Sequence, residues 1–172
     1  MSFLTRLLGT ARDPREQLRA LWHDTVATSR EREWYADCAV ADTVDGRFDM
    51  IALVLALVMI RMERSEALAP RTALLTELFV EDMDRQLRDT GVGDLMVGKN
   101  MGKLMSALGG RMGALRNTLD KDDEDELAAV LERNMRLTTD TPPLALAART
   151  RALHADLARQ TDEGLLAGRV RP

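Results

Sequence analysis

The feature that most constrains this chain is an uninterrupted apolar run, MIALVLALVMI, from Met50 to Ile60. As an α-helix, these eleven residues rise roughly 16 Å, about half the hydrocarbon thickness of a bilayer. Such a run is too short to span a membrane, and because it is apolar on every side it favours the buried centre of a helical fold. We therefore predict a turn over residues 42–49, where Asp-Gly is a strong turn signal, and then a central apolar helix over residues 49–63 with Asp49 as its N-terminal cap.

Apolar residues recur at three- and four-residue spacing through most of the remaining chain, which is typical of amphipathic helices. Gly91 should end the helix that starts near residue 70, and Asp94 should cap the next helix, from 95 to about 119. This next helix is the clearest case, with apolar residues at Val97, Met101, Leu104, Leu108, Met112, Leu115 and Leu119. Aromatic residues make up only 3% of the chain, and no run alternates apolar and polar residues as a strand would. We predict an all-α fold: a single compact domain of about six or seven helices.

The chain has 172 residues, enough for one domain with a real core. We expect residues 1–12 to form a short N-terminal segment, either amphipathic or frayed. The helical domain should cover residues 13–161, beginning at the cap-and-proline pair Asp13-Pro14. Residues 162–172 are predicted to be a flexible C-terminal tail.

The residue types that carry catalysis or bind metals lack the spacing that such chemistry needs. The two histidines, His23 and His154, stand in separate predicted helices, and neither lies three residues after a glutamate, as di-iron bundles require. The single cysteine, Cys38, excludes an internal disulfide and is expected to be buried. No nucleophile-elbow or phosphate-loop motif occurs. We therefore predict a protein that is not an enzyme and uses no metal, cofactor or small-molecule substrate.

Charge changes sign abruptly in the middle of the chain. Residues 77–94 carry six acids and two bases, residues 95–119 carry four bases and no acid, and residues 120–126 are again acidic. The whole chain has a net charge of −4, which argues against sequence-specific or general binding of nucleic acid. We interpret the two helices that meet at this reversal as a partner-binding surface, made of Glu81, Asp82, Asp84, Asp94, Lys99, Lys103, Met101 and Met105.

The basic helix is rich in methionine and glycine, and two interpretations of it stay open. Methionine supplies a deformable apolar surface, and glycine permits close backbone approach although it costs a helix up to about 1 kcal/mol relative to alanine. The helix could be an adaptable docking surface for an apolar partner, with positive charge suited to acidic protein or anionic lipid. It could equally be a core helix whose bases pair with the neighbouring acidic helices.

Three segments resemble the ubiquinol–cytochrome c chaperone family, in its bacterial branch. The most specific is FVEDMDRQLRDTGVGDLMVGK, from Phe79 to Lys99, and it is supported by DGRFD at 45–49 and LAAVLERN at 127–134. The resemblance spans about Trp34 to Leu137, most of the predicted fold. It implies an assembly factor for the cytochrome bc1 complex, a family whose mitochondrial members act on newly made cytochrome b with a small partner protein and the ribosome.

The leading hypothesis is therefore a non-enzymatic chaperone that assists assembly of cytochrome b and the cytochrome bc1 (ubiquinol–cytochrome c reductase) complex. The resemblance implies cytochrome b or another bc1 subunit as partner, with the ribosome and an anionic membrane surface as further contacts. It also implies a cytoplasmic protein, peripheral on the cytoplasmic face of the inner membrane.

Two alternatives remain. One is a general helical protein-interaction adaptor, in homodimeric form. The other is a carboxylate-metal protein that uses Glu77, Glu81 and Asp84, which share one helix face at spacings of four and three residues.

Overall fold

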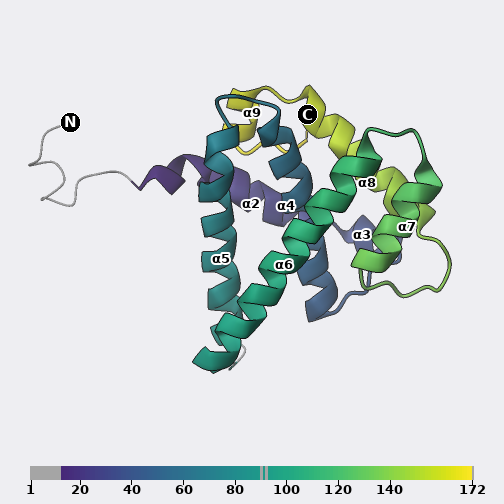
Figure 1. Ribbon diagram of the computed structural model, residues 1–172, viewed down its shortest axis with the longest axis horizontal. Helices are drawn as coiled ribbons and strands as arrows, with labels where there is room; N and C mark the ends of the chain where they lie inside the picture. The colour runs from purple at the N-terminus through teal and green to yellow at the C-terminus, as the bar shows by residue number, and fades with distance from the viewer. Residues whose placement is uncertain (1–12, 90, 92, 172) are drawn as a thin grey trace, which may run out of the picture.

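Helix α4 (Val44–Glu63) runs through the middle of the molecule, and the other helices are arranged around it (Figure 1). In this computed structural model every side chain from Met50 to Ile60 is at most 8% exposed. The predicted central apolar helix is thus confirmed, although it begins at Val44 instead of 49. Among the residues described, no helix has an apolar stretch long enough to cross a bilayer.

The structure describes residues 13–89, 91 and 93–171, with the side chains of Asp94 and Leu95 excepted. The predicted segment 1–12 therefore lies outside the described residues. Around α4 stand, in chain order, the 3-10 helix η1 (Pro14–Leu18), α2 (Arg19–Ser29), α3 (Arg32–Ala36), the 3-10 helix η2 (Ala69–Arg71), α5 (Thr72–Asp89), α6 (Asp94–Leu119), α7 (Glu124–Asn134), α8 (Leu144–Arg159) and α9 (Asp162–Leu166).

The all-α prediction is confirmed. Helices α2, α6 and α8 pack directly on α4, and α7 packs against both α6 and α8. In the described part of the chain the β-type pairing is limited to an isolated antiparallel bridge between Val40 and Leu137.

The start of α4 differs from the prediction, because Thr43 caps the helix instead of Asp49. Thr43 Oγ1 accepts a hydrogen bond from the Gly46 backbone N–H at 3.1 Å. The helix packs here so closely on the preceding loop that a Cβ atom built on Gly46 would lie 1.9 Å from the Ala41 carbonyl oxygen. Residues 44–49, expected as part of a turn, are therefore the first turns of α4, and only glycine fits at 46.

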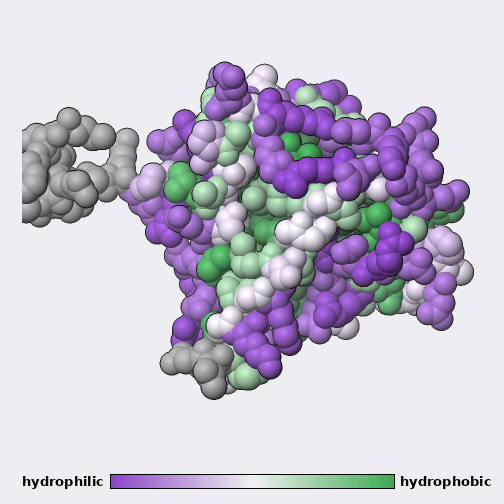
Figure 2. All heavy atoms as spheres, viewed as in Figure 1, coloured by the Kyte–Doolittle hydropathy of each residue, from purple (hydrophilic) through white to green (hydrophobic). Residues whose placement is uncertain are grey.

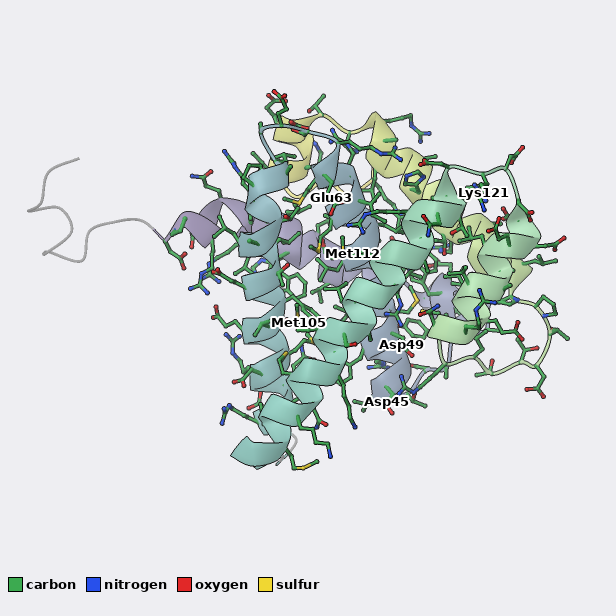
Figure 3. All side chains as sticks on the ribbon, in the orientation of Figure 1. Asp45, Asp49, Glu63, Met105, Met112 and Lys121 are labelled. Carbon is green, nitrogen blue, oxygen red and sulfur yellow. The ribbon has the colours of Figure 1, made fainter. Side chains whose placement is uncertain are left out.

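Asp49 is the centre of an ion-pair cluster that joins three parts of the chain. Arg111 of α6 donates from Nη2 to Asp49 Oδ1 and from Nη1 to the Asp49 carbonyl oxygen, both at 3.1 Å. Arg136, which follows α7, donates to Asp49 Oδ2 from its backbone N–H at 3.1 Å and from Nη1 at 2.8 Å. Arg111 also donates to the Asn134 carbonyl oxygen at the end of α7. Figure 3 shows Asp49 beside the middle of α6.

The Arg111 side chain is only 3% exposed, so its guanidinium must find its partners inside the protein. Burial lowers the pKa of Arg111 below its ordinary value, while the neighbouring Asp49 carboxylate opposes that shift. Because arginine keeps its proton in proteins, Asp49 supplies the counter-charge without which this cation could not be buried.

The C-terminal residues pack on the bundle, contrary to the predicted tail. Thr161 caps α9 by accepting a hydrogen bond from the Gly164 backbone N–H at 3.0 Å. Leu165 and Val170 are fully buried, and the Val170 N–H donates to Asp24 Oδ2 at 2.8 Å. The domain end predicted at 161 therefore does not coincide with the end of the packed core.

We expect Arg111→Met to lower the free energy of unfolding by about 3 kcal/mol, because it leaves a mostly buried Asp49 carboxylate short of counter-charge. Arg116→Met, on the same helix, is the matched control, since its ion pair with Glu63 has side chains that are 45% and 36% exposed. That control should lose less than about 1 kcal/mol. Urea denaturation followed by circular dichroism measures both values, and equal losses would contradict the role given to Arg111.

Candidate functional site

The candidate surface lies where α5 and α6 meet at one end of the molecule (Figure 1). Helix α5 ends at Asp89, and Gly91 turns the chain with a φ of 81°. The Gly91 N–H donates to the Arg88 carbonyl oxygen at 2.9 Å, so the predicted glycine stop is confirmed. Gly93, instead of the predicted Asp94, occupies the cap position of α6, and the Asp94 side chain lies outside the described residues.

Two of the predicted acidic residues are already paired within the chain. Glu81 accepts hydrogen bonds from Arg15 Nη1 of η1 at 2.9 Å and from Arg85 Nη2 at 3.3 Å. Asp84 accepts from Arg88 Nε, one turn later, at 2.7 Å. Ion pairs spaced by four residues on an exposed helix face contribute only about 0.3–0.5 kcal/mol each. A partner could therefore replace Arg85 at Glu81 and Arg88 at Asp84 at small cost.

Asp82 is half-buried and, like Glu81, faces a groove between α2 and α5. The groove has a volume of about 530 Å³ and is also lined by the apolar side chains of Trp22 and Leu78. Within the described residues no three His, Cys, Asp or Glu side chains are placed to hold a metal ion, the Glu77 face of α5 included.

The bases of α6 do not pair with the acids of α5 in the described part of the structure. Arg111 is committed to Asp49, and Arg116 pairs with Glu63 of α4 at 2.6 Å. The Glu63 carboxylate raises the pKa of Arg116 by accepting its hydrogen bonds. Lys99 and Lys103 are exposed, and among the described residues neither has an ion-pair partner. These two lysines are the bases of α6 that remain available to a partner.

Helix α6 divides along its length into a core half and a half-exposed half. Toward its C-terminus, the side chains that face the core are at most 6% exposed: Leu108, Met112, Leu115 and Leu119. Toward its N-terminus Val97 is buried, but Met101 and Met105 are only partly buried against the core, and Met96 is 47% exposed. Figure 3 labels Met105 and Met112, one from each half. The core interpretation is therefore confirmed for the C-terminal half of this helix, and the docking interpretation stays a prediction for the N-terminal half.

Met96 joins the predicted lysines, although the sequence pattern did not single it out. It precedes Lys99 by three residues and Lys103 by seven, so all three lie on one stripe of the helix. That spacing is the signal that could have found it. The stripe combines an exposed apolar side chain with two positive charges that have no ion-pair partner in the described part of the chain.

The glycines of α6 face open space. Apart from the helix's own turns, no described atom lies within 4 Å of a Cβ built on Gly98, Gly102, Gly109, Gly110 or Gly113. Figure 2 shows α6 as a pale band of weakly polar residues, with apolar residues along its upper left side and mostly hydrophilic ones along its lower right side. Because each glycine weakens the helix by about 1 kcal/mol relative to alanine, and no contact within the described chain uses the space it leaves, the band favours close contact with another molecule.

Comparison with known proteins identifies what the chain is similar to. Residues 36–172 match the family model described as Ubiquinol-cytochrome C chaperone. A solved structure, the crystal structure of the Cbp3 homolog from Brucella abortus, superposes with a TM-score of 0.79 at 31% sequence identity. That match covers 99% of this chain and 96% of the other. No curated protein matches the chain.

We expect Gly102→Ala to raise the free energy of unfolding by about 0.5–1 kcal/mol, because alanine favours the helix and nothing obstructs its Cβ. Gly46→Ala should have the opposite effect, since the new Cβ would meet the Ala41 carbonyl oxygen at 1.9 Å. Chemical denaturation of the two variants compares the same substitution in two settings. Destabilisation by Gly102→Ala would show that this face of α6 is not open.

Proposed function

Because the chain belongs to the ubiquinol–cytochrome C chaperone family, we propose that it is a non-enzymatic chaperone that assists assembly of cytochrome b and the cytochrome bc1 complex. The client is cytochrome b or another subunit of that complex. The chaperone would bind the apolar client until the client is assembled into the complex. Such binding needs no covalent chemistry, cofactor or small-molecule substrate.

The observation that carries the proposal is the half-exposed, glycine-lined part of α6. A membrane protein awaiting assembly presents apolar helices, and methionines such as Met96, Met101 and Met105 adapt to apolar surfaces of varied shape. Helices that pack in membranes use small residues to approach closely, and the open positions at Gly98 and Gly102 would allow such an approach.

The charges beside this surface suit the loops of such a client. Cytoplasmic loops of membrane proteins are enriched in lysine and arginine. Glu81, Asp82 and Asp84 on α5 would accept these bases, and the first and last of them would exchange an intramolecular arginine for one from the client. Lys99 and Lys103 would meet acidic side chains of the client. Asp94 belongs to the same proposed set by its position at the start of α6.

The proposal puts the protein in the cytoplasm, peripheral on the cytoplasmic face of the inner membrane. A client with apolar helices is inserted there, so the ribosome that makes it and the anionic membrane surface that receives it are further contacts of the chaperone.

Deletion of the gene tests the proposal. We expect a lower level of the bc1 complex and a weaker haem b signal in membranes, with both restored by the wild-type gene. An unchanged level of the bc1 complex in the deletion strain would contradict the proposal. A protein that forms a stable homodimer in light scattering, and retrieves no cytochrome b in a pull-down, would favour a general adaptor.

Charge reversal tests the proposed surface separately. Lys99→Glu with Lys103→Glu should reduce recovery of cytochrome b in a pull-down by about tenfold or more, since like charges at an interface repel. The matched control is Arg133→Glu with Arg169→Glu, two exposed bases off this surface for which the described residues offer no ion-pair partner. Both variants should unfold at the same denaturant concentration as the parent. Equal loss of recovery in the two variants would rule out this surface.

A further inference from the structure

A basic pocket of about 500 Å³ opens between α2, α3 and the start of α4. Its lining is Arg30, Arg32, Tyr35, Ala36, Asp42 and Arg47. Three arginines and one aspartate give it a net charge of +2, in a chain whose net charge is −4. Arg47 pairs with Asp42 at 2.7 Å. Within the described residues, the side chains of Arg30 and Arg32 have no hydrogen-bond or ion-pair partner, so this excess charge is not satisfied by the fold.

An apolar pocket of about 330 Å³ adjoins the basic one, and the two share Arg30 and Arg47. Val44, Phe48 and Ile51 of α4 supply its apolar lining. Val44 is 63% exposed, the most exposed of the large apolar side chains in the described chain. Gln86 and Asp89 at the end of α5 complete the lining. Cationic and apolar surface therefore lie side by side, within reach of one ligand.

We propose that this double pocket binds an anionic phospholipid of the membrane surface. The lipid phosphate lies among Arg30, Arg32 and Arg47, and acyl-chain carbons contact Val44 and Phe48. The planar guanidinium group of arginine matches the oxygens of a phosphate in a bidentate arrangement. A phospholipid joins its anionic group directly to an apolar chain, which is the order in which the two pockets occur. A nucleic-acid phosphate would satisfy the arginines but would leave the apolar lining without a partner.

This inference rests on the membrane contact in the proposed function and identifies the residues that make it. Within the described part of the chain, none of the residues proposed for the client surface lines either cavity. Arg30 also lines the groove between α2 and α5 that Glu81 and Asp82 line, whereas Arg32 lines the basic pocket and not that groove. The chaperone would thus hold its client on α5 and α6 while α2, α3 and the start of α4 contact lipid. The two contacts can be removed one at a time.

Sedimentation of the full chain with vesicles tests the inference. Vesicles of phosphatidylcholine alone are compared with vesicles in which about a third of the lipid is phosphatidylglycerol. We expect binding only to the anionic vesicles, and loss of that binding near 1 M salt, where the Debye length falls to about 3 Å. Equal binding to both vesicle types would overturn the inference.

The decisive variant is Arg30→Gln with Arg32→Gln, since these two side chains have no intramolecular partner in the described structure and their loss should not disturb folding. Each base near an anionic surface contributes about fivefold to binding, so the double variant should bind about thirtyfold more weakly. Arg133→Gln with Arg169→Gln makes the same change of charge elsewhere and should bind anionic vesicles like the parent. Val44→Ser should weaken binding without altering its dependence on salt.

Two further outcomes separate this inference from the proposed function. If Arg30→Gln with Arg32→Gln still sediments with anionic vesicles as the parent does, the pocket does not bind lipid and the inference fails. If that variant, with its vesicle binding unchanged, also loses cytochrome b in a detergent pull-down, the pocket binds protein instead of lipid. An unchanged bc1 level in the deletion strain would overturn the proposed function and leave the vesicle result standing.

Discussion

The rest of the structure depends on the ion pair between Arg111 and Asp49. Helix α4 is apolar on all sides, and apolar contacts have little directional preference, so packing alone would not fix how α6 lies against it. A buried guanidinium bound to one carboxylate and two carbonyl oxygens accepts a single arrangement. Arg136 binds the same carboxylate from 87 positions along the chain, so α4, α6 and the end of α7 are fixed together.

The cluster around Asp49 and Arg111 also determines the position of the surface proposed to bind the client. Arg111 and the core side chains around it fix the second half of α6, and the first half extends from that anchor with Met96, Lys99 and Lys103 exposed. Two of the segments that carry the family resemblance meet in the cluster, since 45–49 ends at Asp49 and 127–134 ends at Asn134. The third, 79–99, includes the end of α5 and the start of α6.

The sequence predicted the parts of this protein that depend on local patterns. Helical periodicity found α4 and α6, and the glycine stop at 91 was found because a left-handed turn leaves a local signal. Asp49 was misassigned because a carboxylate before an apolar run looks like a cap, while its partner Arg111 is 62 positions away. At the candidate site the sequence showed which residues are charged. Only the fold shows that Arg15 pairs with Glu81 and that Lys99 has no ion-pair partner among the described residues.

The half-exposed N-terminal half of α6, which contains Gly98 and Gly102, bears on how a client would leave. Met101 and Met105 are already partly buried, so a client gains little area from them, and it must also displace arginines from Glu81 and Asp84. Ordering a weakened helix against a partner subtracts further from the binding energy. Small gains set against such costs give a short residence time, since affinity within one interface is governed mainly by the dissociation rate. The surface is thus suited to short-lived binding, from which the client dissociates without an energy source to drive its release.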